Sequence, residues 1–393
     1  MPELVELDGS YGEGGGQMLR TALGLSAALG RPFVMKEVRA KRKKPGLQAQ
    51  HLTAVSVMKK LTGAETKGDY LGSTELFFSP SRPAFGEVEV DTGTAASATL
   101  IVQPLLIASF SGGPVTLRVR GGTDVPLSPT ADYVSEVELP ILSGFGVSSK
   151  FRVLRRGYYP SGGGLVDFSV SRWSPLPIRE LIRGKEVRVR GTSRCSSLPP
   201  SVASRQAESA KRALAEALGV EAEISVEVDR EGLGSSITLV AAIGEVLLGS
   251  DSLGARGLPA EEVGRGAAAR LIEEVKSGAS VDSHMADVLV PFLGIAGGEY
   301  TIPQLSDHVK SNAYVVEAFL GGEVKAEQET SPTGQKSWRL SYPGMRRRRA
   351  RPSVHWLVGR LVSRLGVGDP RRRCHRAFKK GFGIAREGRI GSS

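Results

Sequence analysis

The sequence predicts an α/β protein whose core has three repeated α/β units, with a smaller inserted α/β domain and a basic C-terminal segment. One observation is a pattern that occurs three times: small-residue loop, apolar helix, glycine turn, strand, polar loop and second helix. Another is the spacing of the glycine turns, because Gly30 and Gly113 lie 83 residues apart whereas Gly113 and Gly298 lie 185 apart. The difference predicts an insertion of about 102 residues between the second and third units.

The first five parts of the pattern can be located in each unit. In the first unit they are residues 14–16, 18–29, 30, 33–38 and 39–42. In the second they are residues 93–97, 100–110, 113, 115–119 and 120–124. In the third they are residues 283–287, 288–295, 297–298, 300–305 and 306–310. Such units must pack together to bury their apolar faces, and their polar loops then converge. We expect convergence of Arg39, Arg42, Arg120, Asp124 and His308.

The insertion has the pattern of a small α/β domain of its own. Alternating segments predict strands, and two longer amphipathic segments predict helices. In chain order these segments are residues 187–190 (strand), 200–218 (helix), 224–228 (strand), 237–240 (strand) and 259–276 (helix). We therefore expect a discontinuous core, an inserted domain and a basic extension at residues 1–183 with 277–343, 184–276 and 344–393.

Composition is that of an ordinary globular protein, with 40% hydrophobic and 24% charged residues. The net charge of +11 arises in the last 50 residues, which hold 15 Lys and Arg but 2 Asp and Glu. The remainder is nearly neutral, so any nucleic-acid site in it must be a local cluster. The extension predicts salt-dependent RNA binding, or a helix docked through apolar residues 354–365. The two cysteines form no CxxC pair, and no membrane-spanning or signal-peptide run is present, which predicts a cytoplasmic protein.

A glycine-rich loop at residues 12–17 leads directly into an apolar helix. Backbone N–H groups at such a helix start favour anions, and Glu13 within the loop could hold a divalent cation between phosphates. The loop lacks the Gly-Lys-Ser/Thr of a Walker A motif, and Gln17 replaces the third glycine of a dinucleotide fingerprint. A tight turn packed on a helix is the alternative interpretation.

Several separate motifs in this order resemble those of the RNA 3′-terminal phosphate cyclases. The similarity spans about residues 7–342. Its motifs are GEGGGQMLR from Gly12, RAKRKKPGLQAQHL from Arg39, GGTDVPLSP from Gly121, GYYPSGGG from Gly157, HMADV from His284 and SDHVKSNAYVVEAFL from Ser306. The resemblance implies a core of repeated α/β units with an inserted domain. It also implies an enzyme, a ligase that adenylates a histidine with ATP, transfers AMP to an RNA 3′-phosphate and closes a 2′,3′-cyclic end.

The resemblance also implies roles for individual residues. His308 matches the adenylated histidine, and its imidazole is a suitable nucleophile at neutral pH. Glu13 is expected to contact ATP and a divalent cation, Mg²⁺ or Mn²⁺. Further nucleotide contacts are expected from Gln103, His284, Met285, Ala286, Asp287 and Val288, although many members have glutamine in place of this valine. Contacts to RNA or ATP phosphates are expected from Arg20, Arg39, Arg42 and Gln50, where arginine forks suit phosphate oxygens.

Two alternatives come from other functional classes. Eukaryotic relatives of the cyclases lack the nucleophilic histidine and serve in ribosome assembly, and His308 argues against that role here. A sugar-enolpyruvyl transferase shares this kind of repeated architecture. The stretch 6–9 resembles the Lys-x-Asp-Gly motif of lysine-based nucleotidyl transferases, but a glutamate stands where the lysine is needed. Incorporation of labelled AMP separates these classes. The expected partners are ATP and an RNA with a 3′-phosphate, without a membrane, and the oligomeric state is left open.

Overall fold

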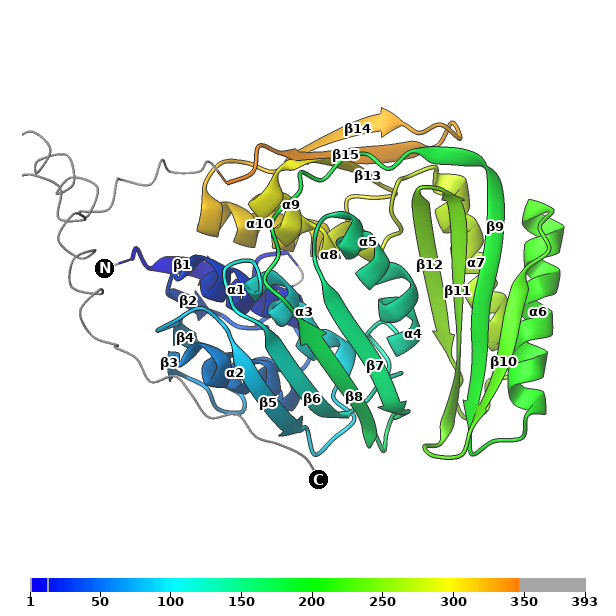
Figure 1. Cartoon of the computed structure of the whole chain (residues 1–393), viewed down its shortest axis with the longest axis horizontal. Coiled ribbons are helices and arrows are strands. Elements are labelled where there is room, and N and C mark those ends of the chain that lie inside the picture. The colour runs from blue at the N-terminus through cyan, green and yellow to red at the C-terminus, as the bar shows by residue number, and fades with distance from the viewer. Residues whose placement is uncertain (1, 13, 346–393) are drawn as a thin grey trace, which may run out of the picture. The chain divides into compact units, whose positions relative to one another are not determined.

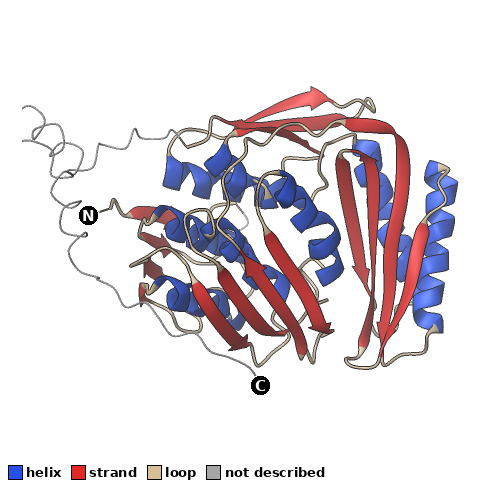
Figure 2. Ribbon diagram, viewed as in Figure 1, coloured by secondary structure: helices blue, strands red, loops and turns tan. Residues whose placement is uncertain are grey.

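The computed structural model describes residues 2–12 and 14–345 of the chain. Glu13, the predicted metal ligand, and the basic extension from residue 346 onward lie outside the described residues. The described part has four β-sheets packed with helices (Figures 1 and 2), which confirms the predicted α/β class. Over these residues, no helix combines the length and the apolar character that crossing a bilayer requires.

The first unit forms a four-stranded sheet with two helices. In chain order its elements are β1 (Val5–Asp8), α1 (Gly16–Leu29), β2 (Phe33–Lys36), α2 (Ala49–Thr62), β3 (Glu65–Lys67) and β4 (Leu76–Ser79). The strands lie in the order β1-β2-β4-β3, with β1 parallel to β2 and the other pairs antiparallel. The apolar residues of α1 are buried, and the helix ends at the predicted glycine turn, Gly30.

The second unit repeats this order of strands. Its elements are β5 (Gly86–Asp91), α3 (Ala98–Ala108), β6 (Val115–Gly121), α4 (Ala131–Tyr133), the π-helical turn η1 (Val134–Glu138), α5 (Leu139–Gly144), β7 (Ser149–Arg155) and β8 (Gly164–Val170). The sheet order is β5-β6-β8-β7, again with only the first pair parallel. The π turn ends two residues before Pro140, which cannot donate a helical hydrogen bond.

The third unit has the same plan, but its first strand is reduced to one residue. Its elements are α8 (Met285–Val288), α9 (Val290–Ala296), β13 (Gly298–Ile302), α10 (Asp307–Leu320), β14 (Lys325–Thr330) and β15 (Lys336–Tyr342). The sheet order is β13-β15-β14, and Ile178 forms a parallel bridge to Gly298, where β1 and β5 pair in the other units. Ile178 precedes the inserted segment and β13 follows it, so this bridge joins the chain on the two sides of the insertion. The place of the insertion between units two and three stays a prediction.

The inserted segment forms a sheet covered by two helices. Its elements are β9 (Arg183–Ser196), α6 (Ser201–Leu218), β10 (Glu223–Asp229), β11 (Gly234–Gly244), β12 (Val246–Leu253) and α7 (Ala260–Ser277). The sheet order is β10-β9-β11-β12, and α6 packs against α7. Leu214, Leu239 and Leu271 belong to an apolar cluster separate from that of the three units. The division of the chain into core and inserted domain stays a prediction.

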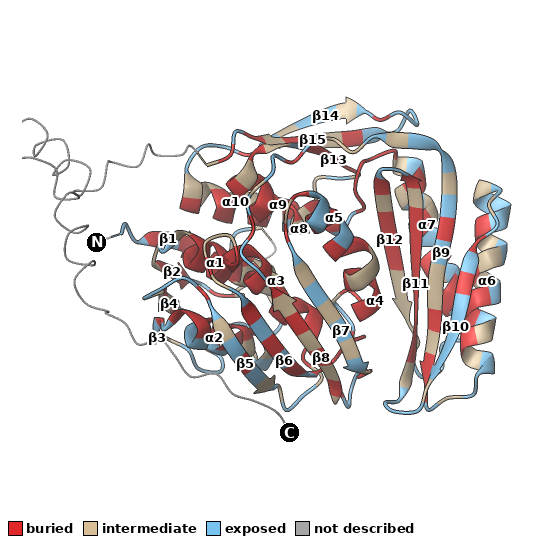
Figure 3. Ribbon diagram, viewed as in Figure 1, coloured by how far each residue is buried: buried red, intermediate tan, exposed pale blue. Residues whose placement is uncertain are grey.

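Helices from all three units pack together in the core. α1 packs against α3 and α10, and α10 packs against α8 and α9. Figure 3 shows that these helices are mostly buried, whereas α6 at the edge of the insertion presents an exposed face. Helix α1 of the first unit therefore contacts helices of both the second and the third unit.

Candidate active site

His308 lies in the first turn of α10, at the meeting of the first and third units. The Ser306 hydroxyl caps this helix by accepting a hydrogen bond from the Val309 N–H at 3.2 Å. The cap fixes the start of the helix, and with it the direction of the half-exposed His308 side chain. Because α10 packs against α1 and α8, side chains of three helix starts meet there.

Gln17 joins His308 to Asp287. The side-chain oxygen of Gln17 contacts His308 Nδ1, and its Nε2 group donates a hydrogen bond to the Asp287 carboxylate. In this orientation the Gln17 amide presents its oxygen, which only accepts hydrogen bonds, to the ring. The contact therefore favours the tautomer with the proton on Nδ1 and the lone pair on Nε2. The Asp287 carboxylate is 3.8 Å from Nδ1 and supports this arrangement electrostatically. Gln17 was not predicted as a site residue, although it stands in the first turn after the glycine loop.

Asp287 is held from the other side by α10. Its carbonyl oxygen accepts a hydrogen bond from Asn312 Nδ2 at 2.8 Å, and Asn312 in turn accepts one from the Thr21 hydroxyl at 2.8 Å. Burial raises the pKa of Asp287, while His284, His308 and the bond from Gln17 act in the opposite direction. The network ties α1, α8 and α10 into one rigid support for the histidine.

The glycine loop before α1 is fixed against α10. Tyr11 stacks on Tyr314 with ring centroids 4.4 Å apart, and the Tyr314 hydroxyl accepts a hydrogen bond from the Asp8 N–H at 2.9 Å. Gly12 has a φ of 58°, and a Cβ atom there would lie 2.4 Å from the Ser311 hydroxyl oxygen, so both the backbone and the close approach favour glycine. The loop is thereby placed beside the first turns of α1 and α10.

The predicted basic loop lies over the glycine loop. Lys41 Nζ donates to the Gly12 carbonyl oxygen at 3.3 Å, and a Cβ on Gly15 would lie 3.2 Å from Arg42 Nη2. The Arg42 guanidinium thus lies at the start of α1, where anions are favoured. Arg39 Nη1 instead donates to the carbonyls of Lys44 and Gly46 at 2.7 and 3.2 Å, so this arginine also holds its own loop.

His51 packs against the start of α1, another role that was not predicted. Its Nδ1 accepts a hydrogen bond from the Gln48 N–H at 3.0 Å, and a Cβ on Gly16 would lie 2.1 Å from its Nε2. Burial, with Arg20 and Arg39 nearby, lowers the pKa of His51 to about 3, so the ring is neutral. Gln50 is its half-buried neighbour in the first turn of α2.

Arg20 and Gln103 form the contact between α1 and α3. Arg20 Nε donates to Gln103 Oε1 at 2.9 Å. Burial lowers the pKa of Arg20 to about 10, against the opposing effect of Asp287 and Glu138, so the guanidinium stays charged at neutral pH. Both residues border a cavity of about 20 Å³. The residues lining this cavity are Gln17, Arg20, Thr21, Gln103, Leu106, Ile107, Glu138, Asp287, Val288, Pro291, Phe292 and Asn312.

The predicted nucleotide residues around α8 occupy different environments. His284 is exposed, and its ring meets the edge of Tyr133 with centroids 5.0 Å apart. Met285 and Ala286 are buried in the apolar core, and the Ala286 carbonyl accepts a hydrogen bond from the Tyr300 hydroxyl at 2.8 Å. Val288 lines the cavity. Their roles in nucleotide binding stay predictions.

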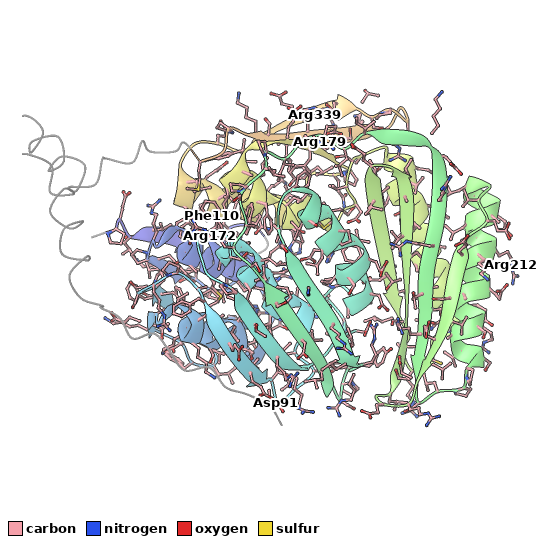
Figure 4. All side chains as sticks on the ribbon, viewed as in Figure 1. Asp91, Phe110, Arg172, Arg179, Arg212 and Arg339 are labelled. Carbon is pink, nitrogen blue, oxygen red and sulfur yellow. The ribbon has the colours of Figure 1, made fainter. Side chains whose placement is uncertain are left out.

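Arg120 and Asp124 do not join the cluster, so the expected convergence is wrong for these two. Arg120 pairs with Asp91 at the exposed end of β5, where Figure 4 shows Asp91. Asp124 is buried, and it accepts hydrogen bonds from Arg156 Nη1 at 3.2 Å and from the Ser236 hydroxyl at 3.3 Å. Asp124 thus connects the second unit to β11 of the insertion.

Comparison with known proteins identifies the family. The family profile described as RNA 3′-terminal phosphate cyclase matches residues 11–326. A protein of Metallosphaera sedula named RNA 3′-terminal phosphate cyclase is 45% identical over 327 residues, covering 82% of this chain and 96% of the relative. Proteins of the same name from Pyrococcus abyssi and Saccharolobus solfataricus are 43% and 46% identical, covering 84% and 82% of this chain and 98% and 96% of the relatives. The chain therefore belongs to the RNA 3′-terminal phosphate cyclase family.

Proposed function

We propose that this chain converts the 3′-phosphate end of an RNA into a 2′,3′-cyclic phosphodiester, using ATP and a covalent AMP adduct on His308. The contact of Gln17 with His308 Nδ1 is the observation that carries the proposal. It favours the tautomer in which Nε2 has the lone pair, and a positioned nitrogen lone pair is what nucleophilic catalysis requires. Family membership supports RNA and ATP as the substrates.

The proposed chemistry has three balanced steps. His308 Nε2 attacks the α-phosphorus of ATP, a P–N bond forms, and pyrophosphate leaves. An oxygen of the RNA 3′-phosphate then attacks the same phosphorus, and the P–N bond breaks to restore the imidazole. Finally, the neighbouring 2′-hydroxyl loses its proton and attacks the 3′-phosphorus, which closes the cyclic phosphodiester and releases AMP.

The cations beside the histidine match the charge of these substrates. Arg42 lies at the start of α1 and Arg20 lies one turn further along the same helix, where their guanidinium groups suit phosphate oxygens. We assign Asp287 and Gln17 to positioning His308, through the contacts that join the three side chains. We assign Gln103 and Val288 to the nucleotide because both line the cavity next to Asp287.

The experiment that tests the proposal combines mass spectrometry with an RNA assay. The protein is incubated with ATP and Mg²⁺ or Mn²⁺, and peptide mapping locates any AMP adduct. RNA ending in a labelled 3′-phosphate is then added, and conversion is followed as resistance of the label to phosphatase. An adduct on His308 with ATP-dependent conversion is expected. An unmodified protein that leaves the RNA unchanged would reject the proposal, and labelling without conversion would restrict it to the first step.

Removing Glu13 is expected to slow the first step and to make it more dependent on metal. We assign Glu13 to a divalent cation because Mg²⁺ is commonly held by one or two carboxylates together with phosphate oxygens and water. Glu13→Ala should therefore form the adduct slowly at low Mn²⁺ and recover in part at high Mn²⁺. Adduct formation is measured by mass across a metal titration. A wild-type metal dependence in the variant would leave Glu13 without this role.

Arg42→Ala is expected to lower the reaction with 3′-phosphate RNA roughly ten- to a hundredfold, because a hydrogen bond to a charged group contributes about 1.5–3 kcal/mol. Arg42 is a cleaner test than Arg39, whose guanidinium also holds the carbonyls of Lys44 and Gly46. The matched control is Arg212→Ala on α6, which Figure 4 shows on the outer helix of the insertion. Rates at subsaturating RNA are compared, and equal rates for the two variants would contradict the assignment.

A further inference from the structure

Glu138 is a buried carboxylate in the cavity wall that the proposed reaction does not use. It is fully buried, and its two carboxylate oxygens accept no hydrogen bond from any residue that the structure describes. Buried acceptors are nearly always satisfied, because an unpaired one loses its hydration without compensation. A carboxylate in this state points to a donor that joins the protein from outside.

The sequence around Glu138 makes its burial more unusual. Val134, Val137, Ile141 and Leu142 are buried at helical spacing, and position 138 falls on the same apolar face. An apolar residue is expected there on packing grounds alone. Glu138 is instead the last residue of the π-helical turn, a distortion that is frequent at functional sites.

The surroundings of Glu138 indicate where the missing donor comes from. The cavity that it borders is also lined by Arg20, Gln103, Asp287 and Val288, which are assigned above to phosphate and nucleotide or to positioning His308. A volume of about 20 Å³ holds one water-sized group. An amino or hydroxyl group of a bound nucleoside therefore fits this space, whereas a whole base does not.

We propose that Glu138 is a specificity-determining residue of the nucleotide site and accepts a hydrogen bond from a donor group of the nucleoside, either the amino group of the base or a ribose hydroxyl. The inference rests on the proposed function, because it takes the nucleotide to be bound beside His308. In its ionised form the Glu138 carboxylate only accepts hydrogen bonds, and it therefore rejects nucleosides that lack the donor. Such a rejection is strong where the protein group is left buried and unpaired.

Glu138→Leu tests this role, since it removes the acceptor and restores an apolar side chain to the apolar helix face. Adduct formation is measured with ATP, with purine riboside triphosphate, which lacks the amino group, and with 2′-deoxy- and 3′-deoxy-ATP. We expect the wild-type protein to discriminate against one of these analogues by roughly ten- to a hundredfold, as for a hydrogen bond to a charged group. The variant should lose that discrimination, and the analogue concerned identifies the donor.

Glu136→Leu is the matched control, because it removes the same charge from the same helical turn. Glu136 is half-exposed and pairs with Arg190 on the insertion, away from the cavity lining. This variant should keep the wild-type preference among the four nucleotides. Equal nucleotide preferences in the wild type and in Glu138→Leu would overturn the inference. A trapped water would then be the only partner of the Glu138 carboxylate.

Stability provides a second measurement that does not depend on catalysis. Burial raises the pKa of Glu138 to about 7. Ionisation of this group therefore destabilises the folded state as the pH rises from the ordinary pKa of a glutamate to about 7. Glu138→Leu should therefore melt at a higher temperature than wild type without nucleotide, with a gain that grows over this pH range. Saturating ATP should stabilise the wild type more than the variant.

The two proposals can fail separately. A nucleotide preference in thermal stabilisation that depends on Glu138, without any AMP adduct, would reject the histidine chemistry but retain the binding role. An adduct on His308 with unchanged nucleotide preference would reject only the role of Glu138. Equal stabilisation of wild type and Glu138→Leu by ATP would also count against that role.

Discussion

His308→Asn is expected to abolish both the AMP adduct and RNA cyclisation while the protein stays folded. The side chain is half-exposed in the first turn of α10, so its replacement leaves the apolar core intact. An asparagine amide can still contact Gln17, but it is not a nucleophile at neutral pH. The measurement is intact mass after incubation with ATP and metal, beside circular dichroism and thermal unfolding. Adduct formation at the wild-type rate would contradict the assignment of His308.

Lys310→Ala is the control for this experiment. Lys310 carries another nitrogen nucleophile near the same helix start, and it pairs with Asp307 at 3.1 Å. The variant should form the adduct as the wild type does, which separates the histidine from its neighbour.

Gln17→Met should form the adduct at a rate between those of His308→Asn and Lys310→Ala. The imidazole remains in this variant, but its tautomer is no longer set, and its pH–rate profile should shift.

Arg156→Met is expected to destabilise the fold by about 3–5 kcal/mol, the range for removing one partner of a buried ion pair. Arg156 is buried between Asp124 and Asp132, and Asp132 also accepts a hydrogen bond from Arg194 Nε at 2.7 Å. Loss of the guanidinium leaves the Asp124 carboxylate uncompensated where the second unit meets the insertion. Urea unfolding followed by fluorescence measures the change.

Arg118→Met provides the matched comparison. Arg118 makes a bidentate pair with Asp167, but the pair is exposed to solvent, so its loss should change the stability much less than the loss of Arg156. Equal effects of Arg156→Met and Arg118→Met would show that the buried network contributes little.

The effect of Arg156→Met should also depend on pH. Burial already raises the pKa of Asp124, and the loss of Arg156 raises it further. The stability of Arg156→Met should therefore fall as pH rises through that pKa and recover at lower pH, where Asp124 is protonated.

Part of the candidate site could be predicted from the sequence because its residues lie in short motifs of neighbouring residues. His308 stands at a helix start after a strand, and Arg42 stands in the basic loop at the equivalent position of the first unit, beside the start of α1. Gln17 was missed because its role depends on two partners roughly 270–290 residues away. Asp124 was misplaced because the insertion covers its loop and provides Ser236 as a partner.

The sequence by itself determined the elements and their repetition. Period and glycine positions placed α1, α3, α6 and α7 within a few residues of their observed bounds, since apolar spacing and chain reversals are local properties. Only the tertiary structure showed that Ile178 pairs with Gly298 across the inserted segment, because a single bridging residue has no periodicity. Only the tertiary structure likewise decided what surrounds Glu138. Its lack of a described hydrogen-bond partner depends on packing between α1, α3 and the π turn, which no local pattern of the sequence predicts.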